Sequence, residues 1–299
     1  RCLDHGGALL WDGSVDVEQA GPFPPSTVVT ALVLTANALY VTGATSGVLS
    51  GECDGPCQSS GGYDAFVRKY VAADEGFRLV WTRQWGTVDN DSFNGLAVGP
   101  AGELRVWGLA QRALQEEPWY ENRALLACYT ADGHSCGDSA LPVSQDQPLQ
   151  GAFAGDTFFL ARLVADEAAP MWNVATRIEA FRLPPGGVAD PVSAWSEAIP
   201  DAWAYGMAAD GSGVLVSGPV FGALPGQASA GGSDAFVRRY DDETGATSWT
   251  LQFGTAAQDT PFAVTGDSEL LLVCGQTTGA MEGGTGVPLP DADGFLAAI

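Results

Sequence analysis

Four aspartates recur at equivalent positions, where their carboxylates could bind a ligand or catalyse a reaction. Each stands just before an apolar segment typical of a strand: Asp91 in DNDSF, Asp146 in QDQP, Asp201 in PDAW and Asp259 in QDTPF. Clustered carboxylates can bind Ca²⁺ or a cationic ligand, or serve as the acid and base of a glycosidase. Aspartate also accepts backbone hydrogen bonds in turns. Recurrence in four segments favours this structural role, because a catalytic pair breaks such a repetition.

A second candidate is the aromatic pair Trp119 and Tyr120 in the segment EEPWYEN. Exposed aromatic side chains in an irregular loop can stack on a sugar or a peptide, but the pattern favours burial against the next blade. Known enzyme motifs are missing, since the chain has no HExxH, no P-loop and no dinucleotide fingerprint. His5 and His134 fall in separate turns, which argues against a Ser-His-Asp arrangement.

The six cysteines form two close pairs and two single residues. The pairs lack the spacing of zinc-binding hooks, so disulfides are the better interpretation, and disulfides indicate an oxidising, extracytoplasmic setting. Three alternatives remain for the single residues: they pair with each other, the one in LLLVCG is a buried thiol, or, as the least favoured, the one at the N-terminal end carries a lipid anchor. The close pairs are Cys53 with Cys57 and Cys128 with Cys136, and the single residues are Cys2 and Cys274.

The charge is strongly one-sided, with 13 Lys and Arg against 36 Asp and Glu, a net charge of −23. An acidic surface repels phosphate backbones and anionic lipids, so we expect no nucleic-acid partner and no membrane insertion. No apolar run approaches the roughly 18 residues that a spanning helix needs. The remaining ligands are cations or neutral molecules, and we expect a monomer that binds an unidentified protein or carbohydrate.

The chain repeats itself. GGYDAFVRKY ends at Tyr70 and GGSDAFVRRY ends at Tyr240, and a pattern of two apolar strands joined by a tight turn occurs five times. Four short antiparallel strands per unit, repeated in this way, predict an all-β fold, a five-bladed β-propeller in one domain over residues 1–299. Segments of the DAFV type begin the five units at nearly even intervals, at Asp64, Arg123, Arg177, Asp234 and Asp293.

The last unit stops after the DGFLAAI strand at the end of the chain. We expect its missing fourth strand to come from GALLWDGSV near the N-terminus, where Trp11 matches Trp81 and Trp249. This closure would lock the propeller and leave no free sheet edge.

The segment GALPGQASAGGSDAFVRRYDDETGATSWTLQFGT resembles the bacterial β-propeller repeat known as the SBBP repeat. The likeness is strong over residues 40–110 and 213–278 and weak over 111–200, where RALLACY and RIEAFRL carry arginine in place of aspartate. It implies a propeller in an extracytoplasmic bacterial setting and no particular activity.

The predicted connections divide into two faces. Turns between the first and second and between the third and fourth strands of a blade are short, and we call their side the turn face. The other connections are long, as in SGVLSGECDGPCQSSGG, and we call their side the loop face. Leu49, Leu224 and Met281 recur in these loops, and their regularity favours side chains that fill gaps between blades over side chains that recognise a ligand.

Long loops on a rigid scaffold usually carry the binding site. We therefore expect a non-catalytic, extracytoplasmic binding or scaffold module that uses the loop face. One alternative is a carbohydrate-active enzyme with the carboxylates at the mouth of the propeller channel, which rests on fold analogy alone. Another is a structural segment of a larger surface protein. No cofactor is expected, although the aspartates leave Ca²⁺ open.

Overall fold

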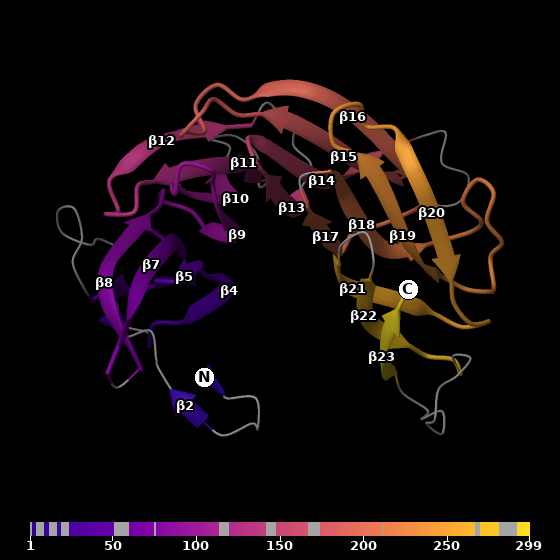
Figure 1. The fold of residues 1–299 in the computed structure, drawn as a ribbon, viewed down its shortest axis with the longest axis horizontal. Helices are drawn as coiled ribbons and strands as arrows, with labels where there is room; N and C mark the ends of the chain where they lie inside the picture. The colour runs from indigo at the N-terminus through magenta and orange to yellow at the C-terminus, as the bar shows by residue number, and fades with distance from the viewer. Residues whose placement is uncertain are drawn as a thin grey trace. The chain divides into compact units, whose positions relative to one another are not determined.

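The computed structural model contains strands, turns and bends and, among the residues described, no helix (Figure 1). The chain divides into two compact units: unit 1 is Arg1–Gln145 with Pro184–Asp190, and unit 2 is Asp146–Leu183 with Pro191–Ile299. The structure describes residues 2–3, 9–11, 17–18, 24–50, 60–74, 76–113, 120–141, 148–166, 174–210, 212–266, 270–280 and 292–299.

Unit 1 holds two four-stranded antiparallel sheets, each with neighbouring strands in chain order. The first is β4 (Thr27–Leu34), β5 (Ala38–Thr45), β7 (Asp64–Ala73) and β8 (Gly76–Trp85). The second is β9 (Asp91–Val98), β10 (Leu104–Ala113), β11 (Tyr120–Tyr129) and β12 (Ser135–Ala140). Two short pairs are added: β1 (Cys2–Leu3) with β2 (Leu9–Trp11), and β3 (Val17–Glu18) with β6 (Val48–Leu49).

Unit 2 holds three sheets of the same antiparallel, consecutive kind. The first is β13 (Pro148–Ala154), β14 (Thr157–Ala165), β15 (Val174–Arg182) and β16 (Val192–Pro200). The second is β17 (Gly206–Ala209), β18 (Gly213–Val220), β19 (Asp234–Asp241) and β20 (Thr247–Phe253). The third is β21 (Asp259–Gly266), β22 (Leu271–Thr277) and β23 (Asp293–Ala298).

These five consecutive sheets confirm the predicted fold class, an all-β, five-bladed β-propeller. The predicted strand order within a blade is also confirmed, because the GLAV, LYVTG, DAFVRKY and LVWTRQWG types occupy first to fourth positions. Within each unit the first strands of neighbouring blades contact one another, β4 with β9 in unit 1 and β17 with β13 and β21 in unit 2.

The last blade has three strands among the described residues, β21, β22 and β23. The strand expected to complete it, β2, forms a local hairpin with β1, in which Trp11 lies opposite Cys2. β1 and β2 lie close together in the sequence, which favours their pairing with each other. Addition of β2 to the last blade would join the two units and stays a prediction.

A tryptophan of the fourth strand connects one blade to the next in each unit. In unit 1, the ring of Trp81 lies 6.1 Å from that of Tyr40 and 6.3 Å from that of Tyr129. In unit 2, Trp195 lies 5.9 Å from both Phe159 and Tyr240. Each set belongs to the buried core of its unit. Such tilted aromatic contacts add about 0.5–1.5 kcal/mol beyond the area they bury.

Two of the three recurring loop residues are buried in the core, Leu49 within its own blade and Leu224 in a cluster that joins two blades. Leu49 is buried with Phe66 and Tyr70 in unit 1, and Leu224 is buried in the core of unit 2. Each also donates its backbone N–H to a glutamine of the fourth strand, Leu49 to Gln84 at 3.1 Å and Leu224 to Gln252 at 2.9 Å. Met281 lies outside the described residues.

The predicted disulfide between Cys128 and Cys136 is confirmed. Cys53 and Cys57 lie outside the described residues. Both interpretations of Cys274 are wrong, because it is a free and exposed cysteine on β22. Side chains alternate between the faces of a strand, so burial of Val273 turns Cys274 to the opposite face.

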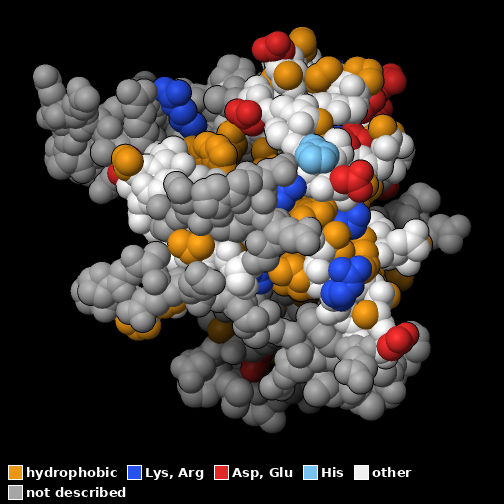
Figure 2. All heavy atoms as spheres, turned by 90° about the vertical axis from the view of Figure 1, so that its left-hand side faces the viewer, with side chains coloured by type: hydrophobic (Ala, Val, Ile, Leu, Met, Phe, Trp, Pro, Cys, Tyr) orange, Lys and Arg blue, Asp and Glu red, His pale blue; other side chains and the backbone are white. Residues whose placement is uncertain are grey.

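None of the described segments is a helix long and apolar enough to cross a membrane. Figure 2 shows one face of the molecule, on which the described acidic side chains are interspersed with basic and hydrophobic ones. The excess of acidic residues therefore does not form one continuous patch on the described part of this face.

Candidate functional site

Two of the four predicted aspartates hold the connections that precede their strands. Asp91 accepts hydrogen bonds from the backbone N–H of Thr87 and from its hydroxyl at 2.9 Å. Asp259 accepts the same two bonds from Thr255 and a further one from the Thr277 hydroxyl. Both carboxylates are buried, with at most 1% of the residue exposed. Their equivalent bonds agree with the turn-forming role that aspartate plays elsewhere.

Burial is also the main influence on the acidity of Asp91. It raises the pKa of this carboxyl, and the nearby charge of Asp64 raises it further, whereas the hydrogen bonds from Thr87 act in the opposite direction. Asp64 itself accepts a bond of 2.8 Å from the Gln84 amide, and Asp234 accepts one of 2.7 Å from Gln252. The buried carboxylates thus belong to repeated structural networks.

The other predicted site residues fall in different places. Asp201 is buried at the connection between β16 and β17, where its positive φ of 49° is a backbone conformation that aspartate tolerates better than most residues. Tyr120 begins β11, whereas Asp146 and Trp119 lie outside the described residues. Among the residues that can be described, no three His, Cys, Asp or Glu side chains gather as a metal site would require.

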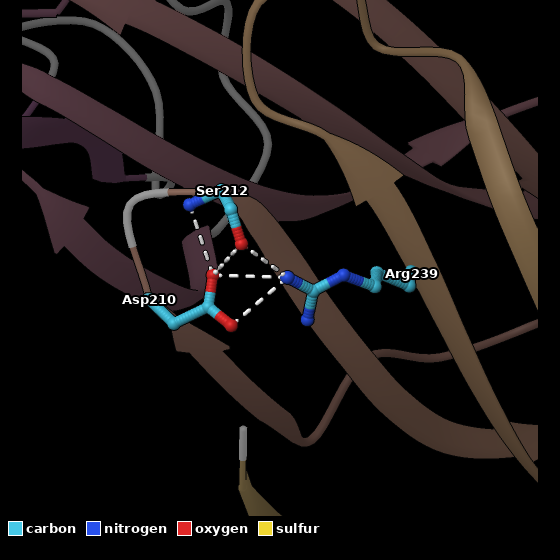
Figure 3. A network of polar contacts seen from close by, with 3 residues as sticks. All are labelled: Asp210, Ser212 and Arg239. Atoms are coloured by element: carbon cyan, nitrogen blue, oxygen red, sulfur yellow. Dashed lines mark hydrogen bonds and ion pairs between the residues drawn. The ribbon is translucent and has the colours of Figure 1, made fainter. Parts of the chain in front are cut away.

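The turn face of unit 2 is held by a polar network. Arg239 on β19 donates to both carboxylate oxygens of Asp210, at 3.0 and 2.9 Å, and to the Ser212 hydroxyl at 2.8 Å (Figure 3). Partial burial alone would raise the pKa of Asp210, but the bonds from Arg239 and Ser212 and the charge of Arg239 together lower it. This network joins the turn between β17 and β18 to the third strand of the blade.

The loop face of unit 2 carries a pocket of about 490 Å³. Its residues come from the connections that precede the first strands of two neighbouring blades, from the first strand β21, from the second strands β18 and β22, and from the position just before β19. Pockets of a few hundred Å³ are of the size that holds small ligands. Among the described residues, no charged side chain lines it.

Strand alternation explains why aromatic side chains line this pocket. Ala202 and Ala204 are fully buried in the core, so the side chains between and after them, Trp203 and Tyr205, point to the other face. On β21, burial of Asp259 likewise turns Thr260 and Phe262 together toward the pocket.

The four aromatic rings of the pocket contact one another in sequence. Trp203 meets Phe221 edge-on at 5.3 Å and Tyr205 at 6.3 Å, and Tyr205 lies 6.4 Å from Phe262. Phe262 is 47% exposed, so its ring is available to a ligand. Burial raises the pKa of the Tyr205 phenol further above its ordinary value.

The polar groups of the pocket have no internal partners. In the described part of the chain, the side-chain amides of Gln258 and Gln276 make no hydrogen bond, and Nε1 of Trp203 is buried without an acceptor. A buried N–H without an acceptor costs about 1–3 kcal/mol.

Two side chains of the same types outside the pocket, a glutamine and a tryptophan, form hydrogen bonds within the protein. Gln252 accepts from Leu224 and donates to Asp234 and, at 2.8 Å, to the Gly222 carbonyl. Nε1 of Trp195 donates to the Asp242 carbonyl at 3.0 Å. The pocket therefore gathers two exposed amides and one buried indole N–H that have no partner among the described residues.

Unit 1 carries a second pocket, of about 570 Å³, also on its loop face. Trp85, Val88 and Leu125 supply apolar walls, and the charged side chains of Asp89, Arg123 and Asp138 also line it. It lacks the set of aromatic rings and amides that unit 2 gathers, so we consider the pocket of unit 2 the better candidate site.

Sequence reasoning missed the pocket of unit 2. A signal was present, since Trp203 and Tyr205 in DAWAYG have the alternation of side chains on one face of a strand. Phe262 in DTPFAV stands on the first strand of the following blade. That these residues meet depends on how two neighbouring blades pack, which a single strand pattern does not show.

Comparisons with known proteins show no family. No family model matches the chain, and no curated protein matches it. The resemblance to the SBBP repeat therefore stays a prediction.

Among solved structures, the chain is similar to one described as a luciferin-regenerating enzyme, with 12% identity, 95% of each chain covered and a TM-score of 0.42. It is also similar to the C-terminal domain of gp131 from bacteriophage phiKZ, with 8% identity, 82% of this chain and 78% of that chain covered, and a TM-score of 0.26. Likenesses this distant carry no argument about activity.

Proposed function

We propose that this protein is a non-catalytic, extracytoplasmic binding module whose ligand enters the loop face. The observation that carries the proposal is the pocket of unit 2, in which Gln258, Gln276 and Nε1 of Trp203 lack internal partners. Buried polar groups in folded proteins are normally paired, which makes the unpaired Nε1 of Trp203 unusual. The amides of Gln258 and Gln276 are exposed, and a few polar groups that converge on a largely apolar surface pocket are typical of a binding site. The Cys128–Cys136 disulfide supports a setting outside the cytoplasm.

The glycosidase alternative is disfavoured by the same contacts. Asp91 and Asp259 are buried and accept the hydrogen bonds that form their own turns, Asp91 through Oδ2 alone, so neither carboxylate is exposed to a substrate. A general acid and a nucleophile need free carboxyl groups about 5–10 Å apart in an open pocket. The pocket of unit 2 has no charged side chain among its described lining residues.

The test is thermal unfolding with panels of glycans and peptides, and with Ca²⁺ alone. A ligand that binds only the folded protein raises the unfolding midpoint. We expect at least one glycan or peptide to raise it, and expect the double variant Q258A/F262A to lose this rise. The matched control is Glu243→Gln, an exposed change on the turn face of the same unit. Equal rises in both variants, or no rise with any ligand, would contradict the proposal.

A further inference from the structure

Resting on the proposed function, we infer that the pocket of unit 2 takes a neutral sugar ring, which lies against Phe262 and hydrogen bonds to Gln258, Gln276 and Nε1 of Trp203. The proposal joins three properties of the pocket: exposed aromatic surface, uncharged lining and free hydrogen-bonding groups. Each property alone fits several ligands. Their combination fits a flat, polyhydroxylated, uncharged ring.

The aromatic surface that would contact the sugar comes from Phe262 and Tyr205. A pyranose has an apolar face of C–H groups, and this face packs on an aromatic ring in the same way as other apolar groups do. Phe262 is 47% exposed and Tyr205 lies 6.4 Å away, so together they form a surface wider than one phenyl ring.

The polar contacts to the sugar would come from side chains that both donate and accept hydrogen bonds. The amide of glutamine offers two donors and one acceptor, which match hydroxyl groups that themselves do both. Gln276 lies directly opposite Thr260 on the neighbouring strand, and Gln258 forms a bridge with Ser233. Amide and hydroxyl groups therefore border the pocket from two sides, and Trp203 adds an indole N–H.

The uncharged lining described for this pocket favours a neutral sugar over an ionic ligand. A phosphate or carboxylate ligand would need a positive side chain, and none is present among the described lining residues. The net charge of −23 further disfavours anions. A proline-rich peptide would also use aromatic surface, but its prolines donate no hydrogen bonds and would leave the amide oxygens of Gln258 and Gln276 unpaired.

The experiment is isothermal titration with free hexoses, pentoses, N-acetylhexosamines and their neutral oligosaccharides, and with a proline-rich peptide. We expect one saccharide class to bind with a single site. Trp203→Phe keeps an aromatic ring and removes the N–H, and should weaken binding about tenfold. Gln276→Leu should weaken it similarly. The matched control is Trp249→Phe, because Trp249 is a partly exposed tryptophan of the same unit outside the pocket.

The outcomes separate this inference from the proposed function. Saccharide binding that Trp203→Phe weakens and Trp249→Phe leaves unchanged supports both. Binding of the peptide but of no saccharide overturns the sugar inference and leaves the binding module standing. Saccharide binding that neither Trp203→Phe nor Gln276→Leu weakens overturns the assigned site. If circular dichroism shows Trp203→Phe to be unfolded, Gln276→Leu decides, since its exposed side chain has no structural partner among the described residues.

Discussion

Nε1 of Trp81, on the fourth strand of one blade, donates a hydrogen bond of 3.1 Å to the carbonyl of Ala131, in the turn of the next blade. Unit 2 repeats this contact, with Trp195 and the Asp242 carbonyl at 3.0 Å. A glycine with positive φ completes each turn, Gly133 or Gly245, and a Cβ there would lie within 3 Å of the tryptophan ring. These tryptophans therefore connect blades by packing and by a hydrogen bond together.

Trp195→Phe should destabilise the protein by about 1–2 kcal/mol, because it removes a hydrogen bond from a buried contact while keeping most of the aromatic packing. Trp249→Phe is the control, since Trp249 is 39% exposed, and it should cost at most about 0.5 kcal/mol. Urea unfolding measures both free energies. Equal losses in the two variants would show that the contact between Trp195 and Asp242 contributes nothing particular.

Gln252→Ala should cost about 2–3 kcal/mol of unfolding free energy. It leaves the buried Asp234 carboxylate without a side-chain partner and the Leu224 N–H without an acceptor. Gln258→Ala is the control, because Gln258 is an exposed glutamine whose side chain has no partner in the described structure, and its stability should stay within about 0.5 kcal/mol. A Gln252→Ala protein as stable as the control would refute the structural role of this network.

Replacing Cys128 and Cys136 together by alanine should lower the unfolding free energy by about 2–3 kcal/mol, as expected when a short loop is no longer closed in the unfolded chain. Alkylation of the native protein under non-reducing denaturing conditions, followed by mass spectrometry, checks the bond itself. We expect neither residue to be labelled. Full labelling of both would show that the disulfide does not form.

The ion pair between Asp210 and Arg239 should make stability depend on pH in the acidic range. The folded state lowers the pKa of Asp210, so its contribution is complete above about pH 4, the ordinary value for aspartate, and disappears as pH falls through the folded pKa. Asp210→Asn should therefore cost about 0.2–1 kcal/mol at neutral pH and nothing near pH 2.

The control for this pH dependence is Glu243→Gln. It removes an exposed carboxylate that has no ion pair with any described residue. The difference in unfolding free energy between this variant and the natural protein should not fall with pH in the way expected for Asp210→Asn. A difference for Asp210→Asn that is constant from neutral to acidic pH would contradict the proposed role of the ion pair.

The repeats made the blades predictable, because each blade is built from local strand–turn–strand units whose apolar alternation is visible in the chain. Leu49 and Leu224 were predictable as core residues for the same reason, since packing keeps a repeat regular. The pocket of unit 2 was not predictable in this way. Trp203 and Gln276 break the regularity of the repeat, and only the packing of two blades shows that they border the same space.

The indole N–H signals in a ¹H–¹⁵N NMR spectrum test the central claim most directly. With the saccharide that binds best, we predict that the Nε1–H signal of Trp203, assigned with Trp203→Phe, shifts as the sugar is added. The Nε1–H signals of Trp81 and Trp195, which already donate to carbonyl oxygens, should stay in place. A shift confined to Trp249 or to other tryptophans, with Trp203 unchanged, would contradict the account.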